Sequence, residues 1–176
     1  MQGRNFSPFP VLKTQRLTLR QLSGGDENEI LALRSDDEVN RYLGRNPARS
    51  IDDARNFIRA INESIEKNES IYWAVTLNGS DTLVGTICLY DFSIDNSKAE
   101  IGYELVPGFQ GKGFMQEAAI KVIDYGIRGM GLRSIDACTH PGNGRSTRLL
   151  EKLGFKKDCS VNDGLVLFRL TREQEE

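Results

Sequence analysis

A strand pattern followed directly by a helix pattern, within residues 98–130, constrains the fold of this 176-residue chain more than any other feature. Polar and apolar residues alternate over residues 98–106, which is typical of a strand with one buried face. Apolar residues then recur at positions 115, 118, 119, 122, 123, 126, 127 and 130, which predicts a helix over residues 113–129 with one apolar stripe. Each element has an apolar face that needs a partner, so we expect a helix packed on a sheet.

The other patterns extend this expectation to the whole chain. Strands are predicted at residues 14–22, 72–77, 83–90, 134–139, 155–160 and 165–170. Helices are predicted after Asp26, which is expected to cap the first of them, from Ser50, and over residues 146–153, where Gly154 fits a left-handed C-terminal cap. This order predicts an α/β protein in which a mixed sheet has helices on both faces. No repeat or long linker divides the chain, so residues 1–176 are expected to form one domain.

The composition excludes several function classes. The 23 Lys and Arg against 25 Asp and Glu give a net charge of −2, which lacks the electrostatic footprint of a nucleic-acid-binding protein. No apolar stretch is long enough for a membrane span, and no signal peptide opens the chain. Three widely spaced cysteines indicate reduced thiols and a cytoplasmic protein. A single histidine removes the common zinc motifs, so no metal is expected.

A glycine turn, residues 110–115, lies between the predicted strand and helix and reads Gln-Gly-Lys-Gly-Phe-Met. Glycines allow a close approach of the backbone to a ligand, and the first N–H groups of a helix attract anions. Lys112 adds a full positive charge, so a diphosphate is a natural ligand for this turn. A plain connection between strand and helix is the other interpretation of the same pattern.

Four motifs in order resemble the GNAT superfamily of acetyl-CoA-dependent N-acetyltransferases, and in particular the ribosomal-protein N-terminal acetyltransferase group. They are residues 12–20, residues 99–107, the glycine turn, and residues 143–155 with Asn143, Ser146 and the sequence Leu-Leu-Glu-Lys-Leu-Gly-Phe. The resemblance covers nearly the whole chain. It implies a single-domain GNAT fold with a mostly antiparallel sheet of about seven strands.

The resemblance also implies where acetyl-CoA binds as co-substrate. Backbone amides of the glycine turn would hold the pyrophosphate, and the strand that precedes the turn would pair with the pantetheine arm across a gap in the sheet. The cofactor-binding residues implied in this way are Leu105, Val106, Gln110, Gly111, Lys112, Gly113, Phe114, Met115, Asn143 and Ser146.

The sequence departs from the family pattern where many GNAT enzymes place a tyrosine as general acid, because Leu150 stands there. Ser146, which the resemblance places near the thioester sulfur, is then the stronger candidate for proton donor. The attacking amine also needs a base. Glu104 and Glu100 lie on one face of the predicted strand, and Glu104 is preferred because it is closer to the expected acetyl site.

The function expected from this resemblance is transfer of an acetyl group to a primary amine, with a protein N-terminal amine of ribosomal type as the favoured acceptor. An N-terminal amine has a pKa near ~8, against ~10.4 for lysine, so it needs less help from a base. A small amine, such as a polyamine, amino acid or drug, is the first alternative, and a non-catalytic acyl-CoA sensor is the second. No nucleic acid or membrane is expected as partner, and both a monomer and a homodimer remain open.

Overall fold

The computed structural model describes residues 3–172, which form one eight-stranded sheet with helices on both faces. The predicted domain ends, residues 1–2 and 173–176, lie outside the described residues. The sheet order is β1-β2-β3-β4-β5-β6-β8-β7. The strands are β1 (Leu12–Lys13), β2 (Leu17–Arg20), β3 (Ile71–Leu77), β4 (Leu83–Tyr90), β5 (Lys98–Leu105), β6 (Ser134–Thr139), β7 (Lys156–Asn162) and β8 (Leu165–Thr171).

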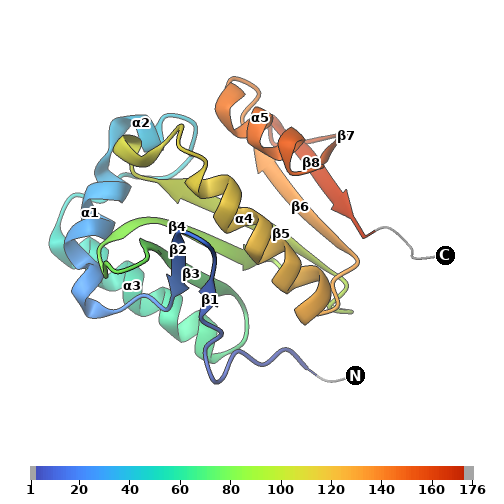
Figure 1. Ribbon diagram of the computed structural model, residues 1–176. Helices are drawn as coiled ribbons and strands as arrows, with labels where there is room; N and C mark the ends of the chain where they lie inside the picture. Colours follow the sequence, from blue (N-terminus) through green and yellow to red (C-terminus); the bar gives the residue numbers. More distant parts are fainter. Residues whose placement is uncertain (1–2, 173–176) are drawn as a thin grey trace.

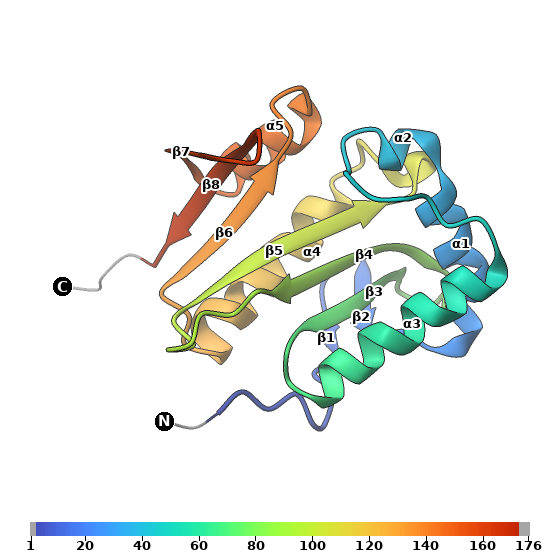
Figure 2. The ribbon, with the colours of Figure 1, turned by 180° about the vertical axis from the view of Figure 1, so that it is seen from behind.

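The helices cover the two faces of the sheet unequally. One face carries the long helix α4, and α5 lies beyond it over β6 and β8, as Figure 1 shows. The other face carries α1 and α3, which lie in front in Figure 2. The helices are α1 (Glu27–Ser35), α2 (Asp37–Asn40), α3 (Ile51–Glu66), α4 (Phe114–Asp124) and α5 (Gly144–Lys152), with short turns η1 (Gly24–Asp26) and η2 (Pro107–Phe109) and a π-helical turn η3 (Tyr125–Gly129). Within residues 3–172, no helix is both long and apolar enough to cross a membrane.

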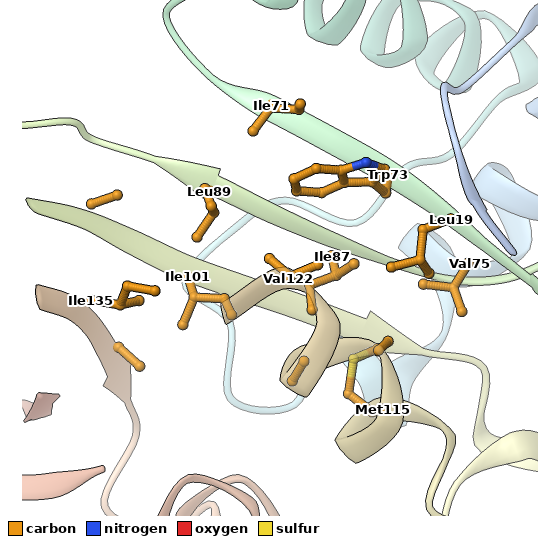
Figure 3. Packing of buried hydrophobic residues seen from close by; sticks show 14 of the residues in the cluster. Leu19, Ile71, Trp73, Val75, Ile87, Leu89, Ile101, Met115, Val122 and Ile135 are labelled. Carbon is orange, nitrogen blue, oxygen red and sulfur yellow. The ribbon is translucent and has the colours of Figure 1, made fainter. Parts of the chain in front are cut away.

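The core confirms the apolar stripe on residues 115–130. Met115 and Val122 of α4 point at Ile87 and Ile101 of the sheet, and Trp73 closes the cluster with no exposed surface (Figure 3). A second, smaller cluster lies under α1 and α3 on the opposite face. Burial of one such aliphatic side chain contributes ~1.5–3 kcal/mol, so the two clusters account for helices on both faces.

Capping residues fix where two of the helices begin. The Ser50 hydroxyl accepts the Asp53 N–H at 3.2 Å, and the Asp53 carboxylate accepts the Ser50 N–H, which starts α3 as a capping box. The Asn143 side chain accepts the Ser146 N–H at 3.1 Å and starts α5.

The sheet opens between β5 and β6. These two strands run parallel, but their pairing covers only three positions and ends at Glu100 and Asp136. Beyond that point β5 stays paired with β4, while β6 stays paired with β8. Figure 2 shows the two strands starting together and then diverging. The gap in the sheet expected from the family resemblance is therefore present.

Several local expectations need correction. The sheet has eight strands and not about seven, because a two-residue strand, β1, pairs with β2 just before the strand predicted at residues 14–22, which is itself shortened to the four residues of β2. Asp26 was expected to cap the helix that follows it, but its carboxylate accepts hydrogen bonds from the Arg20 guanidinium at 2.7 and 2.9 Å and from the Ser23 N–H at 2.8 Å. The predicted left-handed residue after α5 is confirmed, since Gly154 has φ +87°.

Candidate active site

A cleft of about 1270 Å³ occupies the gap between β5 and β6 and extends under the loop that follows α2. Its walls come from the ends of β5 and β6, the N-termini of α4 and α5, and residues of β3 and β4. The sequence-predicted residues Glu100, Glu104, Gln110, Gly113 and Ser146 all line it. The structure therefore brings both carboxylate candidates, the serine and the glycine turn into one cavity.

The glycine turn enters α4 in a conformation that favours glycine. Gly111 has φ +75° and Gly113, the N-cap of α4, has φ +78°. A Cβ on Gly111 would meet nothing within 4 Å, so this side of the turn is open. Lys112 is exposed beside it. Free N–H groups, a helix N-terminus and a lysine together give the turn the chemistry of an anion site.

Arg16, near the start of the chain, and Glu117, in the first turn of α4, together hold the glycine turn in place. The Glu117 carboxylate accepts hydrogen bonds from the Thr14 hydroxyl at 2.6 Å, the Arg16 N–H at 2.8 Å and the Arg16 guanidinium at 2.7 Å. The same guanidinium donates to the Lys112 carbonyl at 3.0 Å. Burial opposes ionisation of Glu117, but these three hydrogen bonds outweigh it and lower the pKa of the carboxyl.

The end of β5 presents backbone groups to the gap. The Val106 N–H donates to the Val84 carbonyl on β4, and the Val106 carbonyl accepts from Phe109, so Val106 is already partnered. Successive residues of a strand point their backbone groups to opposite neighbours, so those of Leu105 point away from β4. The Leu105 carbonyl accepts from the Gln110 side chain at 2.8 Å. Of the two backbone positions implied by the family resemblance, Leu105 is the one whose geometry faces the gap.

Gln110 also carries an unsatisfied atom. Its Oε1 is buried without a hydrogen-bond partner among the described residues. A buried carbonyl oxygen without a donor costs ~1–3 kcal/mol, so it is a place where a ligand N–H would bind. This is the observation by which the cavity fits an amide-containing ligand such as the pantetheine arm.

Tyr103 and Ser146 meet across the gap. The Tyr103 Oη and the Ser146 Oγ are 2.7 Å apart. Burial raises the pKa of Tyr103, and the hydrogen bond to Ser146 opposes this in part. The alternation on β5 predicted Tyr103 as a member of the apolar face, together with Leu105. The ring does pack against the core, but its hydroxyl reaches the cleft.

Glu104 is not a free carboxylate. It forms an ion pair with Arg45, from the loop between α2 and α3, and its side chain is 13% exposed. The Arg45 guanidinium also donates to Asn40 at 2.8 Å, and its Nη2 is buried without a partner among the described residues. Burial and the nearby charge of Arg45 lower the pKa of Arg34, the next cation in this cluster.

Glu100 lies deeper in the gap, among neutral donors. Its Oε1 accepts the Tyr90 hydroxyl at 2.8 Å. Burial first, and then the Glu100 charge and hydrogen bond, raise the pKa of the Cys138 thiol to about 11. Burial and the same carboxylate also raise the pKa of Tyr90. Both neighbours therefore stay protonated at neutral pH, so they remain hydrogen-bond donors toward Glu100.

The mouth of the cleft is bridged by side chains from its two walls. The rings of Tyr42, after α2, and His140, after β6, have centroids 5.2 Å apart. Arg145 and Glu38 approach to 3.6 Å beside them. These contacts join the segment after α2 to the segment after β6 at the cleft.

Charges of both signs lie in and beside the cleft. In one half, Arg148 and Lys152 of α5 line it, and Lys112 is exposed in the glycine turn nearby. The other half is mixed, since Glu38, Glu69, Glu100 and Glu104 line it together with Arg41 and Arg145, and Glu38 pairs with Arg145 and Glu104 with Arg45. The basic half attracts an anionic ligand, and the carboxylates of the mixed half attract a cationic one. In residues 3–172, no three His, Cys, Asp or Glu side chains are grouped to hold a metal ion.

Three site residues were missed by the pattern analysis. Arg16 lies inside the first motif, residues 12–20, but its contact with the glycine turn spans 96 residues, and Arg45 lies outside all four motifs, so no local pattern marks either role. Tyr103 lies inside one of the motifs and carried a signal, since a hydroxyl on the otherwise apolar face of a strand needs a hydrogen-bond partner.

Comparison with known proteins gives a consistent result. Residues 16–156 match the acetyltransferase (GNAT) domain family. An uncharacterized N-acetyltransferase of Bacillus subtilis, YoaA, is 37% identical over 150 residues, which is 85% of each chain. The structure is similar to a GNAT-family acetyltransferase from Bacillus anthracis, with a TM-score of 0.78 at 25% identity over 92% of this chain and 98% of that one. It also has the fold of RimL, a ribosomal alpha-N-protein acetyltransferase solved in complex with coenzyme A, with a TM-score of 0.80 at 15% identity over 92% and 98%.

Proposed function

Because the chain belongs to the GNAT family of N-acetyltransferases, we propose that it transfers the acetyl group of acetyl-CoA to the N-terminal amine of a polypeptide. The observation that carries the proposal is the cleft itself, in which the glycine turn at the N-terminus of α4 and a cluster of carboxylates line one cavity at the open β5–β6 gap. When bound, acetyl-CoA supplies a thioester whose carbonyl carbon is open to attack by a neutral amine.

The cofactor half is assigned as follows. The amides of residues 111–115 and the Lys112 side chain bind the pyrophosphate at the N-terminus of α4, whereas the Gln110 N–H already donates to the Pro107 carbonyl at 3.1 Å. Leu105 and the unsatisfied Oε1 of Gln110 bind amide groups of the pantetheine arm. Asn143 positions Ser146 by capping α5, and the Ser146 hydroxyl donates to the sulfur of the leaving group.

The acceptor half receives the amine. Glu104 and Glu100 attract its cationic form, and Glu104 is the first candidate to take the proton, directly or through water. Its ion pair with Arg45 engages one carboxylate oxygen, and the other is the one assigned to this role. Glu100, which accepts the Tyr90 hydroxyl at 2.8 Å, is the second candidate.

The preference for a polypeptide N-terminus rests on the acceptor half being lined by both apolar and acidic side chains. Val39, Tyr42, Leu43, Ile61 and Tyr72 line it together with the carboxylates. Apolar walls suit an amine attached to an uncharged side chain and backbone, and the contact between Tyr42 and His140 favours a slender, extended segment over a folded surface. Structural similarity to RimL at 15% identity concerns the fold alone.

A small polyamine is the second candidate acceptor. The four carboxylates that line the acceptor half, Glu38, Glu69, Glu100 and Glu104, would suit a ligand with more than one positive charge.

The test is an acetyl-CoA consumption assay with peptides of varied N-termini and with a panel of small amines. We expect free N-terminal peptides to give the higher kcat/KM, with N-acetylated peptides of the same sequence inactive. If polyamines give a higher kcat/KM than the peptides, the acceptor is a polyamine and not a polypeptide N-terminus. Wild-type protein that binds acetyl-CoA but turns over with no amine would overturn the proposal in favour of a sensor.

A separate substitution tests the cofactor site. Gly113→Val places a branched side chain at φ +78°, so we expect acetyl-CoA affinity to fall by about tenfold, or ~1.4 kcal/mol of binding free energy. Gly79→Val is the matched control, because Gly79 has φ +81° in the hairpin between β3 and β4, outside the cleft. Equal affinity in the two folded variants would contradict the pyrophosphate assignment.

A further inference from the structure

The tyrosine that, by the family resemblance, many GNAT enzymes carry on this helix as general acid is absent from α5, and another hydroxyl contacts Ser146 in this structure. Leu150, one turn after Ser146, is aliphatic and only 1% exposed, so it provides no proton donor. The phenol of Tyr103 instead reaches Ser146 from β5, with 2.7 Å between the two oxygens.

The position of this pair follows from the open sheet. The pairing of β5 with β6 ends at Glu100, and Tyr103 lies three residues further along β5. Ser146 is the third residue of α5, on the far side of the gap. Both side chains line the cleft. The hydrogen bond therefore joins the two walls between which the thioester end of the pantetheine arm is assigned.

The direction of this hydrogen bond decides what Ser146 is able to do. A serine hydroxyl has one proton to donate and two lone pairs that accept. If Tyr103 donates to Ser146, the serine proton is left for a third atom in the cleft. If Ser146 donates to Tyr103, its proton is used up. Burial keeps Tyr103 protonated across the neutral pH range, so it is available as the donor.

On the basis of the function proposed above, we propose that Tyr103 is a positioning residue that donates to the Ser146 oxygen and thereby aims the Ser146 proton at the leaving sulfur. As the C–N bond forms and the C–S bond breaks, the electron pair of the broken bond moves to sulfur, where the Ser146 hydroxyl stabilises it by donating a hydrogen bond. The proton released by the amine passes to the carboxylate or to water. No proton leaves Tyr103, which acts only through Ser146.

The test uses Tyr103→Phe, Ser146→Ala and the double variant in the full-length protein. Phenylalanine keeps the packing of the ring and removes only the hydroxyl. Tyr125→Phe is the matched control, since Tyr125 is a partly buried tyrosine whose ring packs on Trp73 outside the cleft. Melting temperatures establish that each variant is folded.

The first readout needs no turnover. Calorimetry compares the affinity for CoA with that for dethio-CoA, which lacks the sulfur, between pH 7 and pH 9. A donated hydrogen bond stabilises a thiolate, so in the wild type the affinity ratio of CoA to dethio-CoA should rise as the thiol ionises. At pH 9, we expect Ser146→Ala to lower the ratio of CoA affinity to dethio-CoA affinity by about tenfold, and Tyr103→Phe to lower it by a smaller factor. The double variant should match Ser146→Ala.

The second readout is the division between kcat and KM. We expect both single variants to lower kcat by about tenfold or more with acetyl-CoA affinity within about twofold of wild type, and the double variant to be no slower than Ser146→Ala. Additive losses, or an unchanged affinity ratio in Tyr103→Phe, would overturn the positioning role. A wild-type protein without acetyltransferase activity would instead overturn the proposed function, which separates the two failures.

Discussion

The guanidinium of Arg16 lies 2.7 Å from the carboxylate of Glu117, although the two residues are 101 positions apart in the sequence. The pair fastens the start of β2 to the first turn of α4, and the second contact of Arg16, with the Lys112 carbonyl, fixes the glycine turn. A residue of the first motif, far from the glycine turn in sequence, therefore holds the proposed pyrophosphate site in shape.

Replacement of Arg16 by Gln should weaken acetyl-CoA binding several-fold with a small loss of stability, because exposed ion pairs contribute only ~0–1 kcal/mol. Calorimetry and thermal unfolding measure the two effects. Arg55→Gln is the control, since it breaks an exposed ion pair with Glu27, which lies on α1 and outside the cleft. If both variants bind acetyl-CoA like the wild type, Arg16 does not position the turn.

The same pair predicts a pH dependence. The pKa of Glu117 is lowered in the folded protein, so its contribution to stability is present above the ordinary value of 4.5 and is lost as pH falls through the folded value. The difference in melting temperature between wild type and Arg16→Gln should therefore be seen at pH 7 and shrink below about pH 4. A difference that persists undiminished in acid would show that the effect is not electrostatic.

The Glu104–Arg45 pair separates two possible roles of Glu104. If Glu104 accepts the amine proton, Glu104→Gln should lower kcat/KM at pH 7 by about 10²–10⁴-fold, with partial recovery at higher pH where more of the amine is neutral. Acetyl-CoA affinity should change little. A pH–rate profile measures this, with Glu100→Gln as the parallel variant.

The contrary outcomes are distinct. A deficit in Glu104→Gln that does not change with pH, together with a lower melting temperature, would mean that Glu104 mainly holds Arg45. A deficit confined to Glu100→Gln would move the base to Glu100. If Glu104→Gln and Glu100→Gln both keep wild-type activity, the enzyme works mainly by positioning the amine against the thioester.

Gly85 on β4 has no side chain, which allows β5 to approach β4 closely beside the cleft. A Cβ on Gly85 would lie 2.4 Å from the Glu104 carbonyl oxygen and 2.9 Å from the Leu105 side chain. We expect Gly85→Ala to cost ~1–3 kcal/mol of stability and to weaken acetyl-CoA binding, because β5 has to shift at Leu105. Gly108→Ala, where a Cβ would meet nothing within 4 Å, should do neither. Denaturant unfolding and calorimetry compare the two variants.

Cys138 should react slowly with alkylating reagents in spite of its place in the cleft. A pKa of about 11 against 9.0 leaves about 100-fold less thiolate at neutral pH. In a Cys88→Ala, Cys159→Ala background, the rate of iodoacetamide labelling should rise about tenfold per pH unit up to about pH 11, and CoA should protect the thiol. Rapid labelling at pH 7 would contradict the raised pKa of Cys138 and the contact of its thiol with Glu100.

The sequence by itself determined the elements that rest on short-range periodicity. The apolar stripe of α4, the alternation on β5 and the glycine turn between them are all encoded within a few residues, so each was predicted before the structure. Ser146, Glu100 and Glu104 were found because they lie in segments that resemble one protein family. The short strand β1, the Asn143 cap of α5 and the hydrogen bonds of Asp26 with Arg20 and Ser23 were not predicted, because each depends on how a few polar groups meet in the folded chain and not on an apolar pattern.

Only the tertiary structure decided which side chains meet. Arg45 reaches Glu104 across 59 residues, and Tyr103 reaches Ser146 across 43. These contacts exist because β5 and β6 separate after Glu100, which opens a cavity where a continuous sheet would have filled the space with backbone hydrogen bonds. Local patterns describe which face of an element is apolar, but the distances between faces follow from packing of the whole chain. The neighbours of each proposed catalytic group are therefore a property of the fold.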